Sequence, residues 1–173
     1  MHSPEPLAAT PTRLQPRKRP LPRSGNGSQA RPKIKQRVYL VGTGVISHHH
    51  AGAAAALPRE TDLYAADPAL AALDHFGQHF PHARLFGTSD EMLAAEDPRE
   101  GDIVCISTPP RFHAPEAMKA LRSGRNVLCE KPLAMNVTEA GVMVGEAGRR
   151  GLHIACCSNR FMGWDLNLKA AEI

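Results

Sequence analysis

A glycine-containing turn is the first stretch of the chain whose residue types suggest chemistry. The apolar run 38–41 has the composition of a strand buried on both faces, and it leads directly into the turn. Gly42 permits a tight turn, and Gly44 lets a phosphate approach the backbone of the helix that follows. We expect a pyrophosphate cradle made of six residues, Gly42, Thr43, Gly44, Val45, Ile46 and Ser47. The alternative is a tight turn in an unrelated α/β protein, because short glycine patterns recur by chance.

An aspartate lies at the distance from this turn that a dinucleotide-binding fold requires. Asp67 follows the second predicted strand, 25 residues after Gly42. In such a fold a carboxylate at this place accepts hydrogen bonds from the adenosine ribose. Because a carboxylate would repel a 2′-phosphate, the pattern favours NAD over NADP. The alternative is an aspartate that only opens a turn before Pro68.

Strand and helix signals alternate from residue 38 onward. Strands are expected at 38–41, 61–66, 83–86, 102–107, 126–129 and 152–157, and helices at 47–57, 69–79, 115–123, 138–150 and from 164. Another helix should begin after Thr88, because 88–91 reads T-x-x-E, which is a capping box. This rhythm implies parallel strands joined by right-handed crossovers. The predicted fold class is therefore α/β, a doubly wound parallel sheet.

Two loops follow later predicted strands. Residues 107–113 read S-T-P-P-R-F-H, and residues 129–134 read C-E-K-P-L-A. Ligands of open parallel sheets bind beyond the carboxyl ends of the strands, so both loops should face the same crevice as the glycine turn. The combination resembles the Gfo/Idh/MocA family, the glucose-fructose oxidoreductase and inositol dehydrogenase group, over about residues 37–173. The resemblance implies a Rossmann-like NAD(P)-binding domain and hydride transfer between a nicotinamide and a sugar or polyol.

The resemblance also implies roles for individual residues. The cofactor cleft would be lined by Ser107, Thr108, Pro109, Pro110, Glu130, Lys131 and Pro132, and the nicotinamide would be flanked by Asn159 and Arg160. Lys131 would hydrogen-bond the hydroxyl that is oxidised, as a catalytic residue. His113, the second catalytic candidate, either contacts substrate or cofactor or caps the helix near residue 115.

Hydride transfer from an alcohol independently requires a group such as this lysine. Hydride leaves a carbinol carbon only as the proton of its hydroxyl is lost, and an ammonium group in a closed cleft can assist that loss. The alternative is that Lys131 is an ordinary surface lysine in a loop between a strand and a helix.

The start of the chain differs in kind from the rest. Residues 1–37 hold nine Lys or Arg and the single acid Glu5, a net charge of +8, whereas the remainder carries −4. Residues 1–36 are therefore expected to be a disordered, basic, proline-rich tail. Such a tail could hold nucleic acid or an anionic membrane weakly through counterion release, but a solvated extension is the favoured interpretation, and nucleic acid is not an expected partner.

The sequence also argues against a membrane-spanning segment and against metal sites. No stretch approaches 18 uninterrupted apolar residues, so no membrane span is expected. The four cysteines form no zinc pattern and are interpreted as small buried hydrophobes in a reducing cytoplasm. The adjacent His48, His49 and His50 would point about 100° apart on a helix and cannot converge on one ion, so no metal site is predicted.

The chain ends at Ile173, within the helix that would lead out of the nucleotide domain. The expected organisation is a tail at 1–36, a dinucleotide-binding domain at 37–163 and the start of a linker helix at 164–173. The family's second domain, a largely antiparallel sheet that holds the substrate and usually builds the oligomer interface, would then be absent. Expected partners are a sugar or polyol substrate and either a complementing C-terminal domain or a second copy of the chain.

Three functions stay open from the sequence. The first is an NAD-dependent sugar or polyol dehydrogenase, here as a truncated cofactor-binding portion. The second is a non-catalytic dinucleotide sensor or interaction module. The third is a methyltransferase, which would have no use for the T-P-P and E-K-P loops.

Overall fold

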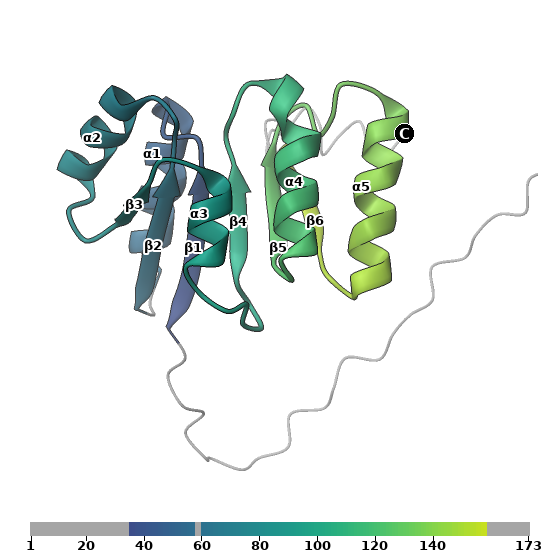
Figure 1. The fold of residues 1–173 in the computed structure, drawn as a ribbon, viewed down its shortest axis with the longest axis horizontal. Helices are drawn as coiled ribbons and strands as arrows, with labels where there is room; N and C mark the ends of the chain where they lie inside the picture. The colour runs from purple at the N-terminus through teal and green to yellow at the C-terminus, as the bar shows by residue number, and fades with distance from the viewer. Residues whose placement is uncertain (1–34, 58–59, 159–173) are drawn as a thin grey trace, which may run out of the picture. The chain divides into compact units, whose positions relative to one another are not determined.

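A single six-stranded parallel sheet forms the centre of the structure (Figure 1). The computed structural model describes residues 35–57 and 60–158. The strands lie in the order β3-β2-β1-β4-β5-β6, and every neighbouring pair is parallel. Their bounds are β1 (Gln36–Val41), β2 (Thr61–Ala66), β3 (Arg84–Phe86), β4 (Ile103–Ile106), β5 (Asn126–Glu130) and β6 (Ile154–Cys157). This order reverses between β1 and β4, which is the arrangement of a Rossmann-like fold.

The central strand β1 is buried on both faces, as its apolar run predicts. Leu40 lies opposite Ala65 of β2 and Cys105 of β4, and all three are buried. Successive β1 side chains point to opposite faces. Tyr39 and Val41 belong to one hydrophobic core, and Val38 and Leu40 belong to the other.

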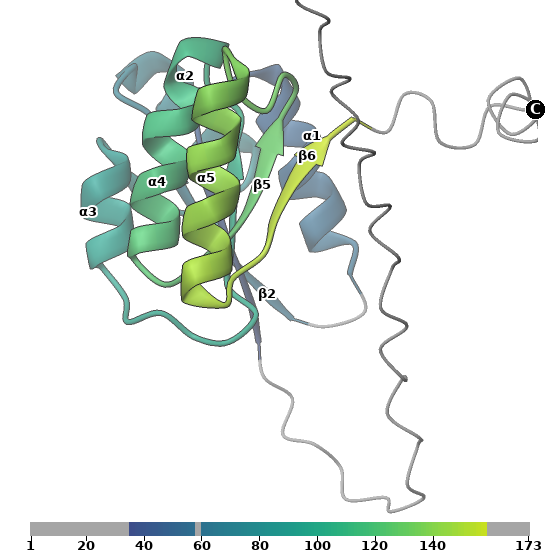
Figure 2. The same cartoon turned by 90° about the vertical axis from the view of Figure 1, so that its right-hand side faces the viewer.

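Helices cover the two faces of the sheet (Figures 1 and 2). On one face, α1 (Val45–Ala55) and α2 (Leu70–His79) pack on the core that contains Leu40. On the other face, α3 (Ser89–Ala94), α4 (His113–Arg122) and α5 (Val137–Arg150) pack on the core that contains Tyr39. The doubly wound α/β fold predicted from the sequence is therefore confirmed.

The boundaries differ from the expected ones by a few residues. Thr88 caps α3 by accepting a hydrogen bond from the Glu91 N–H, as the T-x-x-E pattern predicts. The main difference precedes α4, where a short 3-10 turn, η1 (Pro110–Phe112), leads into a helix that begins at His113 rather than near residue 115. The predicted tail and the predicted linker helix at 164–173 lie outside the described residues.

Three charged side chains are buried at the amino end of the sheet. Arg37 of β1 donates to both carboxylate oxygens of Asp102, at 2.9 and 2.5 Å. Arg125, which precedes β5, lies 3.6 Å from Asp102 and over the ring of Tyr39. These three charged residues are at most 2% exposed. The network ties the starts of β1, β4 and β5 together, at the edge opposite the predicted site.

The cysteines do not all match the expectation of burial. Cys105 and Cys129 are buried, but Cys156 is exposed and Cys157 is only half-buried, because both lie on the edge strand β6. Desolvation raises the pKa of the Cys105 and Cys129 thiols to about 12.

Alkylation should therefore distinguish the thiols. Iodoacetamide is expected to label Cys156 in the folded protein and to leave Cys105 and Cys129 unlabelled, since only the thiolate reacts and both are shielded from the reagent. Peptide mass mapping with and without urea measures this. Equal labelling of all four without denaturant would contradict the burial.

No helix among the described residues is long and apolar enough to cross a membrane.

Candidate functional site

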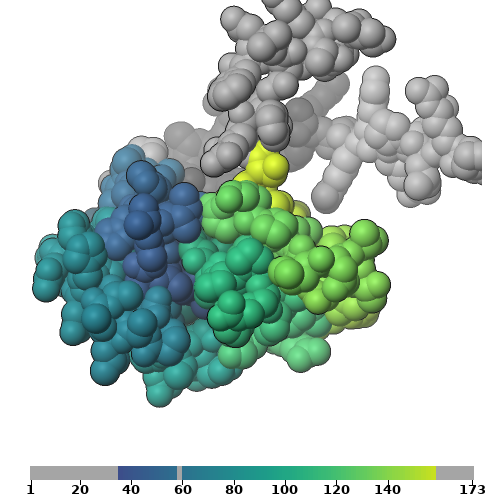
Figure 3. All heavy atoms as spheres, turned by 90° about the horizontal axis from the view of Figure 1, so that it is seen from above, coloured from purple at the N-terminus to yellow at the C-terminus, as the bar shows by residue number. Residues whose placement is uncertain are grey.

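The predicted site residues meet at one edge of the sheet. β1, β2, β4 and β5 end at Val41, Ala66, Ile106 and Glu130, and Figure 3 views the molecule from this side. Two cavities open there, of about 700 Å³ and about 410 Å³. Both are lined by Ser107 and Thr108, so they form two parts of one cleft.

The glycine turn has the geometry that its sequence predicts. Gly42 has a φ of +88°, and a Cβ built on it would lie 3.0 Å from the Ser107 carbonyl oxygen. Only glycine therefore allows β1 to turn this close to the end of β4. Gly44 precedes the first residue of α1, and a Cβ built there meets nothing within 4 Å. The space above Gly44 is thus open to a ligand. The first N–H groups of a helix have no acceptor within it, and of those of α1 the Ser47 N–H donates to the Gly44 carbonyl at 3.0 Å.

Thr43 and Ser47 hold the turn in place. Both are buried. The Ser47 hydroxyl donates to the Gly42 carbonyl, while the N–H and hydroxyl of Thr43 donate to Asp67 at 2.8 and 3.1 Å. In contrast, Val45 and Ile46 are exposed on the first turn of α1. Within the predicted cradle, a ligand can thus reach Gly44, Val45 and Ile46. Thr43 and Ser47 are buried, and their hydrogen bonds hold the turn.

Asp67 combines features of both alternatives stated for it. One carboxylate oxygen accepts from the Ala69 N–H at 2.8 Å, which forms the turn after β2, and the other accepts from Thr43. The carboxylate also lines the larger cavity. Thr43 donates twice to the same oxygen, whereas the oxygen that accepts from Ala69 has a second acceptor site free, so the carboxylate can still meet a hydroxyl of a ligand.

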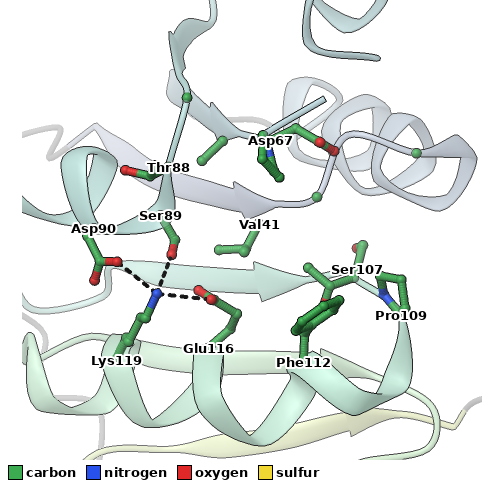
Figure 4. Close-up of a pocket in the computed structure, with 16 residues that line it drawn as sticks. Val41, Asp67, Thr88, Ser89, Asp90, Ser107, Pro109, Phe112, Glu116 and Lys119 are labelled. Atoms are coloured by element: carbon green, nitrogen blue, oxygen red, sulfur yellow. Dashed lines mark hydrogen bonds and ion pairs between the residues drawn. The ribbon is translucent and has the colours of Figure 1, made fainter. Parts of the chain in front are cut away.

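The larger cavity extends from Asp67 to α4 (Figure 4). Opposite Asp67, the ammonium of Lys119 binds Ser89, Asp90 and Glu116 at 3.2, 2.8 and 3.1 Å. The hydrogen bond to Asp90 raises the pKa of Lys119 above its usual value. The cavity is also lined by Gly87, Thr88 and Phe112, which the sequence did not assign to the cofactor site. The signal was present, since Gly87 and Thr88 follow β3 just as the other site loops follow their strands.

His113 links the two loops of the cleft. It is only 1% exposed, and its ring nitrogens lie 2.6 Å from the Pro132 carbonyl oxygen and 2.8 Å from the Thr108 carbonyl oxygen. A carbonyl oxygen only accepts, so a ring nitrogen of His113 donates to its carbonyl when it carries a proton. The helix-cap role does not fit this geometry, whereas a contact with substrate or cofactor stays a prediction. His113 does not cap α4, because its side chain points to the loops, and both of its nitrogens are already occupied by the protein.

Lys131 lies in the smaller cavity with Glu130, Ile46 and Cys157. The peptide bond between Lys131 and Pro132 is cis. Lys131 is exposed, and its ammonium has no hydrogen bond or ion pair with any residue that the structure describes. Glu130 is held on one side by His50 of α1, at 3.0 Å, and on the other by the Lys131 N–H, at 3.2 Å.

Several buried polar atoms along the cleft lack partners. Within residues 35–57 and 60–158, the hydroxyls of Ser107 and Thr108 and one carboxylate oxygen of Glu116 are buried without a hydrogen bond. Buried polar groups are nearly always satisfied, by protein, water or ligand. Of the predicted cofactor residues, Asn159 and Arg160 lie outside the described part of the chain.

Comparison with known proteins supplies the family. The model of the Gfo/Idh/MocA oxidoreductase family, described as an NAD-binding Rossmann fold, matches residues 36–156. Trans-1,2-dihydrobenzene-1,2-diol dehydrogenase of Danio rerio is 37% identical over 112 residues, which cover 64% of this chain and 33% of that protein. An uncharacterised oxidoreductase of Schizosaccharomyces pombe is 31% identical over 144 residues, which cover 82% of this chain and 37% of that protein.

A solved structure agrees with this assignment. The WlbA dehydrogenase from Bordetella pertussis, crystallised in complex with NADH and UDP-GlcNAcA, is 29% identical and superposes with a TM-score of 0.71 over 80% of this chain and 41% of that chain. This chain therefore spans between 33% and 41% of the length of the three relatives. By its family match, its fold and the loops of its cleft, the chain belongs to the Gfo/Idh/MocA oxidoreductases.

Proposed function

We propose that this chain binds NAD(H) and forms the cofactor-binding portion of a dehydrogenase that acts on a hydroxyl-bearing carbon of a sugar or polyol. The observation that carries the proposal is the cleft itself, in which the glycine turn, Asp67 and Lys131 face two joined cavities. The unpartnered Ser107 and Thr108 hydroxyls lie where the two cavities meet. A polar ligand that spans both cavities would satisfy them.

The two cavities suit the two ends of a dinucleotide. The adenosine end fits the larger one, where Asp67 can accept from a ribose hydroxyl, and the nicotinamide end fits the smaller one beside Lys131. The pyrophosphate between them fits the open space over Gly44, at the positive end of the α1 dipole.

Lys131 is proposed as the residue that handles the proton. The bound nicotinamide accepts or donates the hydride, and the protein must manage the proton of the substrate hydroxyl. The Lys131 ammonium can hydrogen-bond that oxygen, because no described residue engages it. Glu130, fixed by His50, holds the Lys131 backbone N–H. The substrate class follows that of the relatives, whose names indicate a diol and a nucleotide sugar.

Side-by-side titration tests the proposed function. The fluorescence of NADH should change saturably as the protein is added. NADH should bind more tightly than NADPH, and S-adenosylmethionine should not bind. The methyltransferase alternative predicts the reverse. Failure of both nicotinamide cofactors to bind would overturn the proposal and leave only a shared fold.

Exchange of Asp67 for asparagine tests the ribose contact. Asp67→Asn keeps the size of the side chain and one oxygen, but removes the negative charge. NADH binding should weaken roughly tenfold, or about 1.4 kcal/mol. NADPH binding should be unchanged or stronger, because the repulsion of its 2′-phosphate is removed. Equal loss for both cofactors would show that Asp67 serves only the turn.

His113 is proposed as a positioning residue, since it holds the Thr108 and Pro132 carbonyls and through them the two loops. His113→Phe fills the same space without the two hydrogen bonds. The free energy of unfolding should fall by about 1–3 kcal/mol. Affinity for NADH should also fall several-fold under conditions where circular dichroism shows the variant folded. His82→Phe, at an exposed position, is the control. Unchanged NADH affinity in folded His113→Phe would reduce His113 to a structural role.

A further inference from the structure

Three histidines from two helices meet on the face of the sheet that α1 and α2 cover. His48 lies in the first turns of α1, and His75 and His79 lie one turn apart on α2. The ring centroids are 5.4 Å apart for His48 and His75, 5.2 Å for His48 and His79, and 4.6 Å for His75 and His79. Each residue offers a ring nitrogen, and these nitrogens lie within 4.8 Å of one another.

In two of these rings a hydrogen bond determines which nitrogen carries the proton. His48 Nδ1 lies 3.1 Å from the Gly44 carbonyl oxygen, and His79 Nδ1 lies 2.9 Å from the His75 carbonyl oxygen. Because a carbonyl only accepts, Nδ1 of each ring carries the proton, and in the neutral ring Nε2 then carries a lone pair. The same division of roles is found in metal-binding histidines, whose other ring nitrogen donates to a backbone carbonyl.

His48 Nε2 provides a second, independent observation. Among the described residues it is one of the few buried side-chain polar atoms without a hydrogen-bond partner. Its ring is surrounded by Phe76 and Phe80, at 5.1 and 5.8 Å, and by the two other histidines. The phenyl rings carry no group that can bind the Nε2 lone pair. A cation bound between the three histidines would do so.

We propose that His48, His75 and His79 form a binding site for a divalent transition metal of the zinc class. Imidazole nitrogens suit Zn²⁺, Cu²⁺ and Ni²⁺ rather than Mg²⁺ or Ca²⁺, which prefer oxygen. Zinc–nitrogen distances of about 2.0–2.1 Å require the three nitrogens to approach one another, and the exposed side chains of His75 and His79 have room to rotate. The fourth position of a tetrahedral site stays open to water.

This site is separate from the cofactor cleft. None of the three histidines lines either cavity there. A bound metal would join α1, which follows the glycine turn, to α2, which follows Asp67 and Pro68. It would therefore clamp the two helices whose starts carry the proposed phosphate and ribose contacts. The sequence argument concerned a metal held by three adjacent histidines, whereas the proposed site takes only His48 of them, together with His75 and His79 of α2.

A second group, His50, Glu130 and Cys157, has ligand atoms equally close together. It belongs to the proposed catalytic end of the cleft, so the experiment must distinguish it from the histidine site. The thiol provides the means, because a thiolate bound to Co²⁺ gives an intense near-ultraviolet charge-transfer band that nitrogen ligands do not give.

The test titrates the untagged 173-residue chain, stripped with a chelator, first with Zn²⁺ by calorimetry and then with Co²⁺ by absorption spectroscopy. We expect a saturable site, a tetrahedral Co²⁺ spectrum without a thiolate band, and a higher melting temperature with Zn²⁺. His75→Ala and His79→Ala should each weaken Zn²⁺ binding by more than about 100-fold, the upper limit for loss of a mere outer-sphere partner. Both residues are exposed, so these variants should fold.

The controls are His49→Ala and His82→Ala, two exposed histidines outside the cluster, which should bind Zn²⁺ like the parent chain. Absence of a saturable site, or equal affinity in His75→Ala and the parent chain, would overturn the proposal. A thiolate band that disappears in Cys157→Ser would place the metal at the other group and would also overturn it. None of these outcomes depends on whether the chain binds NADH.

Discussion

Replacement of Asp102 by alanine is expected to lower the free energy of unfolding by about 3–5 kcal/mol, because it removes the carboxylate between two buried arginines and leaves Arg37 only its longer ion pair with Glu96, at 3.4 Å. Arg37 and Arg125 are at most 2% exposed, and Asp102 lies between them. The carboxylate also accepts from the Arg99 N–H at 3.0 Å, so its removal frees a backbone donor as well. Urea unfolding followed by circular dichroism measures the loss.

Asp97→Ala is the matched control, because the Asp97 side chain is exposed and only its backbone carbonyl meets Arg37. It should change the free energy of unfolding by less than about 0.5 kcal/mol. A loss below about 1 kcal/mol for Asp102→Ala would show that water reaches the arginines and that the network contributes little. Because the network lies at the amino end of the sheet, NADH affinity of the folded variant should stay near that of the parent chain.

Much of the fold could be predicted because its signals are local. The apolar run of β1, the Gly42 turn and the alternation of strands and helices each follow from residues close in sequence. The rule that ligands bind beyond the carboxyl ends of parallel strands then brought the loops after β1, β4 and β5 together without knowledge of their distances. The same rule applied to β3 would have found Gly87 and Thr88 as well.

What could not be predicted depends on contacts between distant segments. His113 was assigned a choice between substrate and helix cap, but its partners are carbonyls of two loops, one of them 19 residues away. His48 lies close to His75 and His79 only because α1 and α2 pack on the same face, and the spacing of these residues in the sequence does not predict this contact. Cys156 and Cys157 were expected to be buried because the strand pattern does not show that β6 lies at the edge of the sheet.

The glycine turn allows a sharp test of the cofactor site, because one of its glycines can be changed without strain. Gly44 has φ −69° and ψ −175°, which any residue adopts, and a Cβ built there meets no protein atom within 4 Å. Gly44→Val should therefore fold, with a loss of about 1 kcal/mol at most from the poorer helix cap. Its branched side chain would, however, fill the space through which a pyrophosphate approaches the α1 N-terminus.

NADH affinity of Gly44→Val should consequently fall at least about 100-fold, or about 2.7 kcal/mol, while the melting temperature shifts by only a few degrees. Gly52→Ala is the control, since Gly52 lies in α1 with open space around it, and alanine there should stabilise the helix by about 0.5–1 kcal/mol without changing NADH affinity. Gly42→Val differs from both, because its side chain would collide with the backbone of Ser107 and should reduce stability and binding together. Full NADH affinity in folded Gly44→Val would mean that no phosphate lies over this turn, and the dinucleotide would have to bind elsewhere than in the cleft between Asp67 and Lys131.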